Sequence, residues 1–259
     1  RIVPLLWLML ILDFSWRLLN PSLEDPSLTG MIAHFLMVAN NKQEFFFHET
    51  KHLWSVCVEA HFYLLAGAVF WFARRKGLLT LVLIGLCMGT YRALLSDPFN
   101  TTTPYRLDEL LIPLCIGLIW TNSSGSLDTV KRNLSTLSPW IPLAALFIAC
   151  LAPPSPVLFP MRPLFAAIFI GTLIYNTNGH ASRFFRSTRW RWLSDHSYAL
   201  YMIHPFLLVT WLGTGDKITV YMKRPLLFLA LLVLAWLSTR YYEKFFIALG
   251  KRLVKRRLA

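Results

Sequence analysis

The sequence predicts an all-α protein, a polytopic bundle of transmembrane helices that forms a single domain over residues 1–259. Hydrophobic residues make up 56% of the chain and charged residues only 15%, against about 45–50% and about 25% in an average soluble domain. The mean hydropathy is +0.50. So few charged side chains cannot cover a water-exposed surface, and the 10 Trp, 9 Tyr and 19 Phe suit the aromatic belts of a membrane interface.

Eight apolar runs supply the helices of this bundle, since a helix needs about 20 mostly apolar residues to cross a bilayer core. Pro113 and Pro142 lie within two short runs, so either run could be tilted, broken or re-entrant. No loop is long enough for a separate soluble domain. The runs cover residues 2–19, 53–73, 78–95, 107–121, 139–153, 161–176, 193–212 and 225–243.

The net charge of +13 would suggest nucleic-acid binding in a soluble protein, but here the basic residues gather in short segments between apolar runs. Such placement is typical of topogenic charge that stays on the cytoplasmic side. With an even number of spans both chain ends share one side, and that side holds most of the lysines and arginines. We therefore expect both ends in the cytoplasm, contact with the lipid bilayer, and no nucleic-acid partner.

Two connecting segments are expected to lie along the membrane surface. The outer loop 20–52 contains an apolar stretch, 31–38, that suits a short interfacial helix. In the inner loop 177–192, four arginines are interleaved with aromatic residues. Such a mixture can bind RNA, but between two spans it favours a helix in the cytoplasmic lipid interface.

Glu59 is the most informative polar residue, because it stands nearly two turns inside the second span. A charged side chain near the bilayer centre costs roughly 2.5–3.5 kcal/mol on insertion scales. Helical spacing places His52, Ser55, Glu59 and Tyr63 on one face, so the carboxylate would face into the bundle. It either takes part in chemistry or pins neighbouring helices together.

The seventh span repeats this pattern of polar residues inside an apolar run. Ser197, Tyr201 and His204 follow one another at i, i+4 and i+7 and form a polar stripe, and Pro205 frees a carbonyl near Tyr201. His204, near the middle of the membrane, either hydrogen-bonds another helix or takes a direct chemical role.

The other charged residues of the spans are expected to be structural. The charges of 106–109 open the fourth span and Glu243 closes the last, and at a helix end a long side chain reaches water at little cost. Asp13 and Arg17, at i and i+4, would neutralise each other. No metal-ligand spacing, phosphate-binding Gly-rich loop or nucleophile elbow occurs, so no metal is expected.

Four stretches of the chain resemble one known family. Residues 52–64, HLWSVCVEAHFYL, resemble the signature LWSLSVEEQFYL of the acyltransferase family 3 membrane proteins, which include O-acetyltransferases of O-antigen and exopolysaccharide. Residues 1–5 are similar to the end of the family segment RRxxRIYPLY, 105–111 to RLDALLLG, and 193–205 to ISYSLYLWHWP. Residues 242–244, near the end, stand where the family often has IERP.

The chain also departs from the family pattern. Ala60 and His61 replace the usual Glu-Gln after Glu59, and Lys244 with Phe245 replaces Arg-Pro. In the family, the helix that holds the catalytic Arg and His precedes the segment at which this chain begins. The expected general base is therefore outside the sequence, which would be either a truncated piece or a degenerate homologue.

The resemblance implies a membrane O-acyltransferase in the inner membrane of a bacterium. It would move an acyl group, in the first place acetyl, from acyl-CoA to a hydroxyl of a cell-surface glycan or related acceptor. Acyl-CoA, with acetyl-CoA as the expected donor, would arrive from the cytoplasm, where basic loops can meet its phosphates. The acceptor would be reached from the outer side.

The resemblance also implies roles for individual residues. Glu59 would orient the missing histidine or the acceptor hydroxyl, and Arg1 would contribute to donor binding. The remaining catalytic candidates are Trp54, Ser55 and Tyr63, which would shape the site, and His204.

Two alternatives stay open from the sequence. A secondary transporter, or a flippase of envelope precursors, would use Glu59 and His204 as proton or substrate sites at the midplane, although the chain shows no paired halves. A catalytically inactive family member would only scaffold other envelope proteins.

Overall fold

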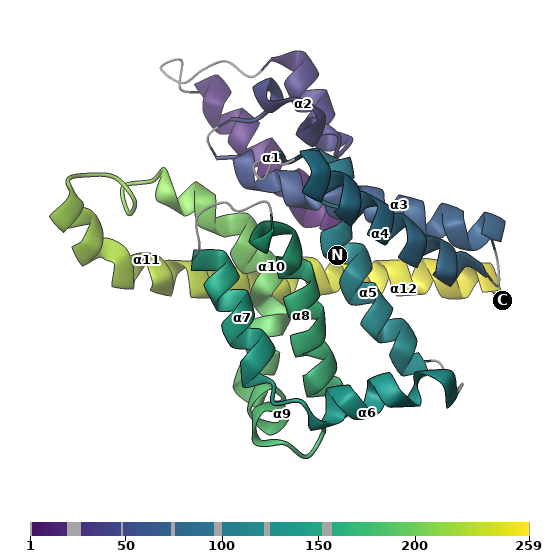
Figure 1. Cartoon of the computed structure of the whole chain (residues 1–259). Helices are drawn as coiled ribbons and strands as arrows, with labels where there is room; N and C mark the ends of the chain where they lie inside the picture. Colours follow the sequence, from purple (N-terminus) through teal and green to yellow (C-terminus); the bar gives the residue numbers. More distant parts are fainter. Residues whose placement is uncertain are drawn as a thin grey trace. The chain divides into compact units, whose positions relative to one another are not determined.

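The computed structural model describes residues 2–19, 27–47, 49–73, 76–95, 100–121, 125–151 and 157–258 (Figure 1). All regular structure in these residues is helical, and none of them forms a strand. The prediction of an all-α protein is confirmed. The chain divides into two compact units, of which unit 1 comprises Arg1–Ala39, Gln43–His52 and Ser187–Ala259, and unit 2 comprises Asn40–Lys42 and Leu53–Arg186.

Unit 1 is built on α1 (Ile2–Leu19), α10 (Thr188–Leu208) and α11 (Lys217–Leu237), with the short α2 (Leu28–Phe35) packed against α1. Leu5, Leu6 and Leu10 are almost fully buried, so one stripe of α1 forms the core. Two tyrosines hold the first turn of α1, because Tyr198 donates to the carbonyl of Ile2 at 2.7 Å and Tyr242 to that of Pro4 at 2.9 Å.

The end of unit 1 is one helical rod in which α11, the π-helix η7 (Ser238–Glu243) and α12 (Lys244–Leu258) follow without a break (Figure 1). Asp216 caps its start by accepting from the backbone N–H of Ile218 and Thr219, and hydrogen bonds from Thr219 lower the pKa of this carboxyl. The apolar part, Lys217–Val254, has 38 residues, about 57 Å of helix. The bilayer core is about 30 Å thick, so part of the rod lies outside it.

Unit 2 contains α3 (Trp54–Ala73), α4 (Gly77–Leu95), α5 (Asp108–Thr121), α6 (Asp128–Thr136), α7 (Trp140–Leu151), α8 (Leu158–Tyr175) and α9 (His180–Phe185). Leu81, Leu107 and Leu111 form a core into which Phe62 of α3 packs. Here α4 and α5 approach closely, since a Cβ at Gly85 would stand 2.7 Å from the Cβ of Leu111. A second core joins α5, α6 and α8.

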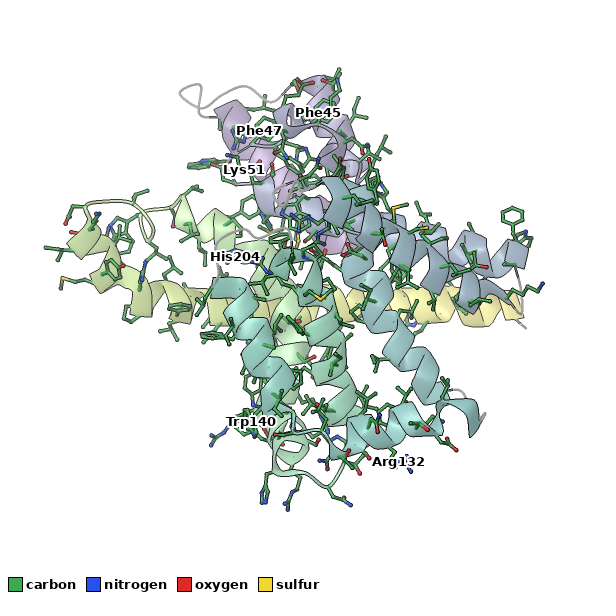
Figure 2. The ribbon with its side chains drawn as sticks, viewed as in Figure 1. Phe45, Phe47, Lys51, Arg132, Trp140 and His204 are labelled. Carbon is green, nitrogen blue, oxygen red and sulfur yellow. The ribbon has the colours of Figure 1, made fainter. Side chains whose placement is uncertain are left out.

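Length and composition qualify four helices of the described chain as membrane spans, or five if a bent pair counts as one. The bent pair is α6 with α7, which meet at 81°, and Arg132 and Trp140 stand on either side of the bend (Figure 2). The run 139–153 is short and contains α7, but it is not broken at Pro142, because this proline lies inside α7 and the bend precedes the helix, between Thr136 and Trp140. The expected runs 78–95, 107–121 and 193–212 form α4, α5 and α10, and the total of eight spans stays a prediction.

The two surface segments differ in detail from expectation. The segment 177–192 is not one helix, because α9 ends at Phe185 and α10 begins at Thr188, continuous with the following apolar run. The helix expected over 31–38 is α2, which begins at Leu28 and ends at Phe35. Just beyond it, Met37 adopts a positive φ of 58° and helps to end the helix.

Candidate active site

Glu59 and Tyr63 form a hydrogen-bonded pair on α3, as their spacing predicted. The Tyr63 hydroxyl donates to Glu59 Oε1 at 2.7 Å. Glu59 is half-buried, and Tyr63 is 54% exposed. No described residue bonds Oε2 of Glu59, so the carboxylate has an open oxygen on a helix that is long and apolar enough to cross a membrane. An ionisable group in such a helix is expensive and marks a functional candidate.

Trp54 and Ser55 form the first turn of α3, and both are half-buried. The guanidinium of Arg106 lies over the Trp54 indole, with its Cζ 5.1 Å from the ring centroid. An arginine over an aromatic face is attracted by the ring quadrupole. Trp54 therefore links α3 to Arg106, which lies just before α5.

Of the charges of 106–109, Arg106 and Asp108 are buried and only Glu109 is partly exposed, so the expectation that these charges reach water cheaply was wrong for the first two. Asp108 is fully buried, and Arg92 and Arg106 are 3% and 8% exposed. Arg92 Nη1 donates to Asp108 Oδ1 at 3.0 Å and to Glu109 Oε1 at 2.9 Å, and Arg106 donates to the same Glu109 oxygen at 2.8 Å. Arg92 comes from the last turn of α4, so the ions join α4 to the start of α5.

The ring of Phe159, in the first turn of α8, sits against this network. Arg92 Nη2 donates to the Phe159 carbonyl at 3.3 Å, and three guanidiniums lie over the ring. Their Cζ atoms are 4.7 Å (Arg92), 5.3 Å (Arg106) and 4.1 Å (Arg162) from its centroid. Arg162 also donates twice to the carbonyl of Ala149, in α7. One end of unit 2 is thus rich in arginine.

The loop before α5 is anchored to the same end of the unit. The side chain of Asn40 donates to Thr103 Oγ1 at 2.9 Å and to the Thr101 carbonyl at 3.2 Å. His61 of α3 also bonds the Thr103 hydroxyl. These contacts hold Arg106, which follows the loop, in place beside Trp54.

His204 lies in unit 1, in a group of aromatic and imidazole rings (Figure 2). The His52 ring is 5.6 Å from that of His204 and 5.1 Å from that of Tyr201, and the Tyr201 hydroxyl donates to the His52 carbonyl. His52 therefore does not share a helix face with Glu59, because it precedes α3, in the turn Lys51–Leu53.

Backbone contacts fix the tautomers of both histidines. Nδ1 of His204 lies 2.7 Å from the Tyr201 carbonyl, and Nδ1 of His52 lies 2.9 Å from the Glu49 carbonyl. A carbonyl oxygen only accepts, so Nδ1 carries the proton in each neutral ring and Nε2 keeps its lone pair. No described residue bonds Nε2 of His204, which can accept a proton.

A second buried ion group lies in unit 1. Arg17 pairs with Asp13 at 3.2 Å, as expected, and also with Glu49, which the sequence did not suggest. His34 is 2% exposed, with Nδ1 on the Gly30 carbonyl at 2.8 Å and Nε2 facing the Thr50 hydroxyl at 3.1 Å. Burial lowers the pKa of this imidazole, which is held neutral.

Glu243 also differs from expectation, because it is 1% exposed and does not reach water. It lies at the end of the π-helix, where the Thr239 hydroxyl donates to its Oε1 at 3.1 Å. Wide π turns often occur at functional sites. Arg1 lies outside the described residues.

Sequence comparison decides the family. The family model for the acyltransferase domain of acyltransferase family 3 matches residues 1–240. The chain belongs to this family. It is also 25% identical over 244 residues to the peptidoglycan O-acetyltransferase OatA of Listeria monocytogenes serovar 1/2a, a match that covers 81% of this chain and 39% of that protein. The chain thus spans well under half the length of this relative. No solved structure matches this chain.

Membership of acyltransferase family 3 confirms the resemblance found in the motifs and, with the apolar helices, makes the chain an integral membrane protein. Neither the family match nor this relative favours the transporter, flippase or inactive alternatives. Of the predicted site residues, Glu59 and Tyr63 are in contact, Trp54 and Ser55 lie one turn before them, and His204 belongs to unit 1. In the described part of the chain, no three His, Cys, Asp or Glu side chains gather as metal ligands would.

The motifs missed Arg92, Arg162 and Glu49, and the sequence placed His52 on the wrong face. A signal existed for two of them, since a lone arginine inside each of the runs 78–95 and 161–176 is costly and needs a partner. The hydrogen-bond partners of Arg92 and Arg162 lie at sequence separations of 13 to 67, which no helical periodicity can indicate.

Proposed function

We propose that the chain belongs to a membrane O-acyltransferase that moves an acetyl group from acetyl-CoA to a hydroxyl of a cell-envelope glycan. The proposed acceptor is peptidoglycan, the glycan in the name of the Listeria relative. In this proposal the protein lies in the inner membrane of a bacterium with eight spans and both ends in the cytoplasm. The donor arrives from the cytoplasm and the glycan from the other side.

The observation that carries this proposal is the Glu59–Tyr63 pair. A carboxylate with one oxygen held by a phenol at 2.7 Å and the other open can accept a hydrogen bond from a substrate hydroxyl. It stands on a helix that is apolar and long enough to cross a membrane. In surroundings of low dielectric, such a hydrogen bond is stronger than in water.

The reaction transfers one acyl group and one proton. The acceptor oxygen attacks the thioester carbonyl, the C–O bond forms, the C–S bond breaks, and the thiol of CoA leaves with a proton. Glu59 orients either the attacking hydroxyl or the histidine that takes its proton, and positioned acid–base groups of this kind contribute about 10²–10⁴-fold. Trp54, Ser55 and Tyr63 shape the site, and Arg1 contributes to donor binding.

His204 is the second candidate for the proton acceptor. Its Nδ1–H is fixed on the Tyr201 carbonyl at 2.7 Å, so in the neutral ring Nε2 carries the lone pair, and no described residue bonds it. This geometry suits a general base.

The test is Glu59→Gln in the full-length protein, reconstituted in nanodiscs with acetyl-CoA and a peptidoglycan oligosaccharide. Gln keeps the oxygen that accepts from Tyr63, so the fold should persist. Release of the CoA thiol and ester on the glycan, both measured, should fall about 10²–10⁴-fold. Glu44→Gln is the matched control, because Glu44 is an exposed acid of the loop before α3 and its loss should leave the rate unchanged.

Two results would contradict the proposal. If the unaltered protein transfers no acetyl group from acetyl-CoA to the glycan, the function is wrong. If the Glu59 variant folds and transfers acetyl at the parental rate, Glu59 is structural, and His204→Gln becomes the decisive variant.

A further inference from the structure

Three arginines and two carboxylates meet around Phe159 at one end of unit 2. Asp108 and Glu109 lie within 3.0 Å of arginine nitrogens of Arg92 and Arg106. These two carboxylates neutralise two of the three guanidiniums over the ring. Among the described residues, the third guanidinium, that of Arg162, has no carboxylate partner.

Arg162 is the uncompensated member. Among the described residues, no carboxylate lies within 4.0 Å of its guanidinium, whose Nε and Nη2 both donate to the carbonyl of Ala149, at 3.1 and 2.8 Å. Its Nη1 bonds no described residue. Arg162 is half-buried in α8, a helix long and apolar enough to span a membrane. Arg162 is the fifth residue of α8, and the contact of its guanidinium with the Phe159 ring at 4.1 Å holds it at this end of the helix.

This end of unit 2 also contacts α3, the helix that carries the candidate catalytic carboxylate Glu59. Arg106, which shares the Phe159 ring with Arg162, covers the indole of Trp54. Trp54 and Glu59 are five residues apart on α3, about 7.5 Å along the helix axis.

Arg92 has a buried donor that the described residues leave unsatisfied. Nε of Arg92 is buried without a hydrogen-bond partner in the described chain, although Arg92 is only 3% exposed. Native proteins rarely leave such a donor unsatisfied. Arg92 therefore keeps one N–H donor that its two carboxylates and the Phe159 carbonyl do not use.

We propose that Arg162, with Arg106 beside it, binds the carboxylate of an acidic glycan acceptor and so places the acceptor hydroxyl near Glu59. The inference rests on the proposed function. A guanidinium presents parallel N–H donors that match a carboxylate. The single guanidinium charge of Arg162 balances one carboxylate and falls short of the several phosphate charges of CoA.

The experiment measures binding, so it is independent of turnover. The protein is placed in nanodiscs of zwitterionic lipid and titrated calorimetrically with a hexasaccharide of alternating N-acetylglucosamine and N-acetylmuramic acid, then with its carboxyl-reduced form. We expect the acidic form to bind about 10- to 100-fold more tightly, the factor typical of a charge-assisted hydrogen bond. Arg162→Gln should remove this preference, and Arg162→Lys should keep part of it.

Arg224→Gln is the matched control. Like Arg162, Arg224 lies over an aromatic ring, since its Cζ is 3.9 Å from the centroid of Tyr221. This variant should keep the full preference. If it loses the preference as Arg162→Gln does, the effect is one of general charge and the inference is wrong.

Equal binding of the two hexasaccharides by the unaltered protein overturns the inference, and this comparison holds even if an Arg162 variant fails to fold. Displacement of the acidic hexasaccharide by CoA in competition also overturns it, because the site would then take donor phosphates. Either result leaves the acetyl-transfer assay intact. Loss of acetyl transfer with retained acid preference would instead refute the proposed function alone.

Discussion

Replacing Asp108 by Asn should destabilise unit 2 strongly. Asp108 is fully buried and accepts from Arg92 Nη1 through both oxygens, at 3.0 and 3.1 Å. Asn keeps the shape and one acceptor oxygen but removes the charge that compensates a guanidinium only 3% exposed. Breaking a buried ion pair from one side costs about 3–5 kcal/mol.

The second carboxylate reduces this cost. Glu109 remains 2.9 Å from Arg92, but its side chain is 35% exposed and it also serves Arg106. We therefore expect the lower end of the range, about 3 kcal/mol. For a domain of this size that corresponds to a fall in Tm of roughly 6–12 °C.

The matched control is Asp128→Asn in the same unit. Asp128 pairs with Lys131 at 3.8 Å, and its side chain is 71% exposed. An exposed pair at i and i+3 contributes at most about 0.5 kcal/mol, so this variant should melt within 2 °C or so of the parent. Both variants are compared by thermal unfolding in nanodiscs of one lipid composition.

A double variant separates the pair from its surroundings. If Arg92 and Asp108 stabilise each other, Arg92→Leu with Asp108→Leu should cost clearly less than the sum of the single changes, because no charge is left uncompensated. Equal Tm values for Asp108→Asn and Asp128→Asn would refute this reasoning. The charges at the start of α5 would then be reaching water, as the sequence alone suggested.

Two further predictions concern unit 1 and the topology. The pKa of His34 is lowered by burial, so the unfolded state binds the extra proton and the stabilisation is complete above pH 6.5 and lost as the pH falls below it. His34→Gln should therefore lose less Tm between pH 7.5 and 5.5 than the parent, and an equal loss would assign the pH dependence to another group. For topology, single-Cys variants at Lys76 and Thr102 should be labelled from the cytoplasmic and the outer side respectively. If the cysteine at position 102 is labelled from the cytoplasmic side alone, the predicted orientation is wrong.

Helical periodicity accounts for what the sequence could predict. Apolar runs locate α1, α3 and α8 to within a few residues, because hydrophobic composition and helix length are local properties. The Glu59–Tyr63 and Asp13–Arg17 contacts are also local, since residues at i and i+4 are neighbours on any helix. The motif resemblance adds the family, which composition cannot supply.

Long-range contacts account for what the sequence could not predict. The Arg92–Asp108 pair joins two helices, and the His52–His204 contact joins residues 152 positions apart. His52 was placed on the face of Glu59 by extending the helix one turn too far, whereas a turn at Lys51–Leu53 directs its ring elsewhere. Whether a charge at a helix end is buried depends on the neighbouring helix, and periodicity holds no information about that neighbour.

Ion pairing sorts the arginines of this chain into two kinds. Arg17 and Arg92 each contact two carboxylates, so their burial is compensated and their loss is expected to appear in stability. Arg162 contacts a carbonyl and an aromatic ring but no carboxylate in the described residues, so nothing within the fold balances its charge. A membrane protein that keeps one such cation beside a compensated network bears a cost in the folded state that a bound anion would remove. The difference between these arginines, more than their shared burial, identifies which of them acts on a ligand.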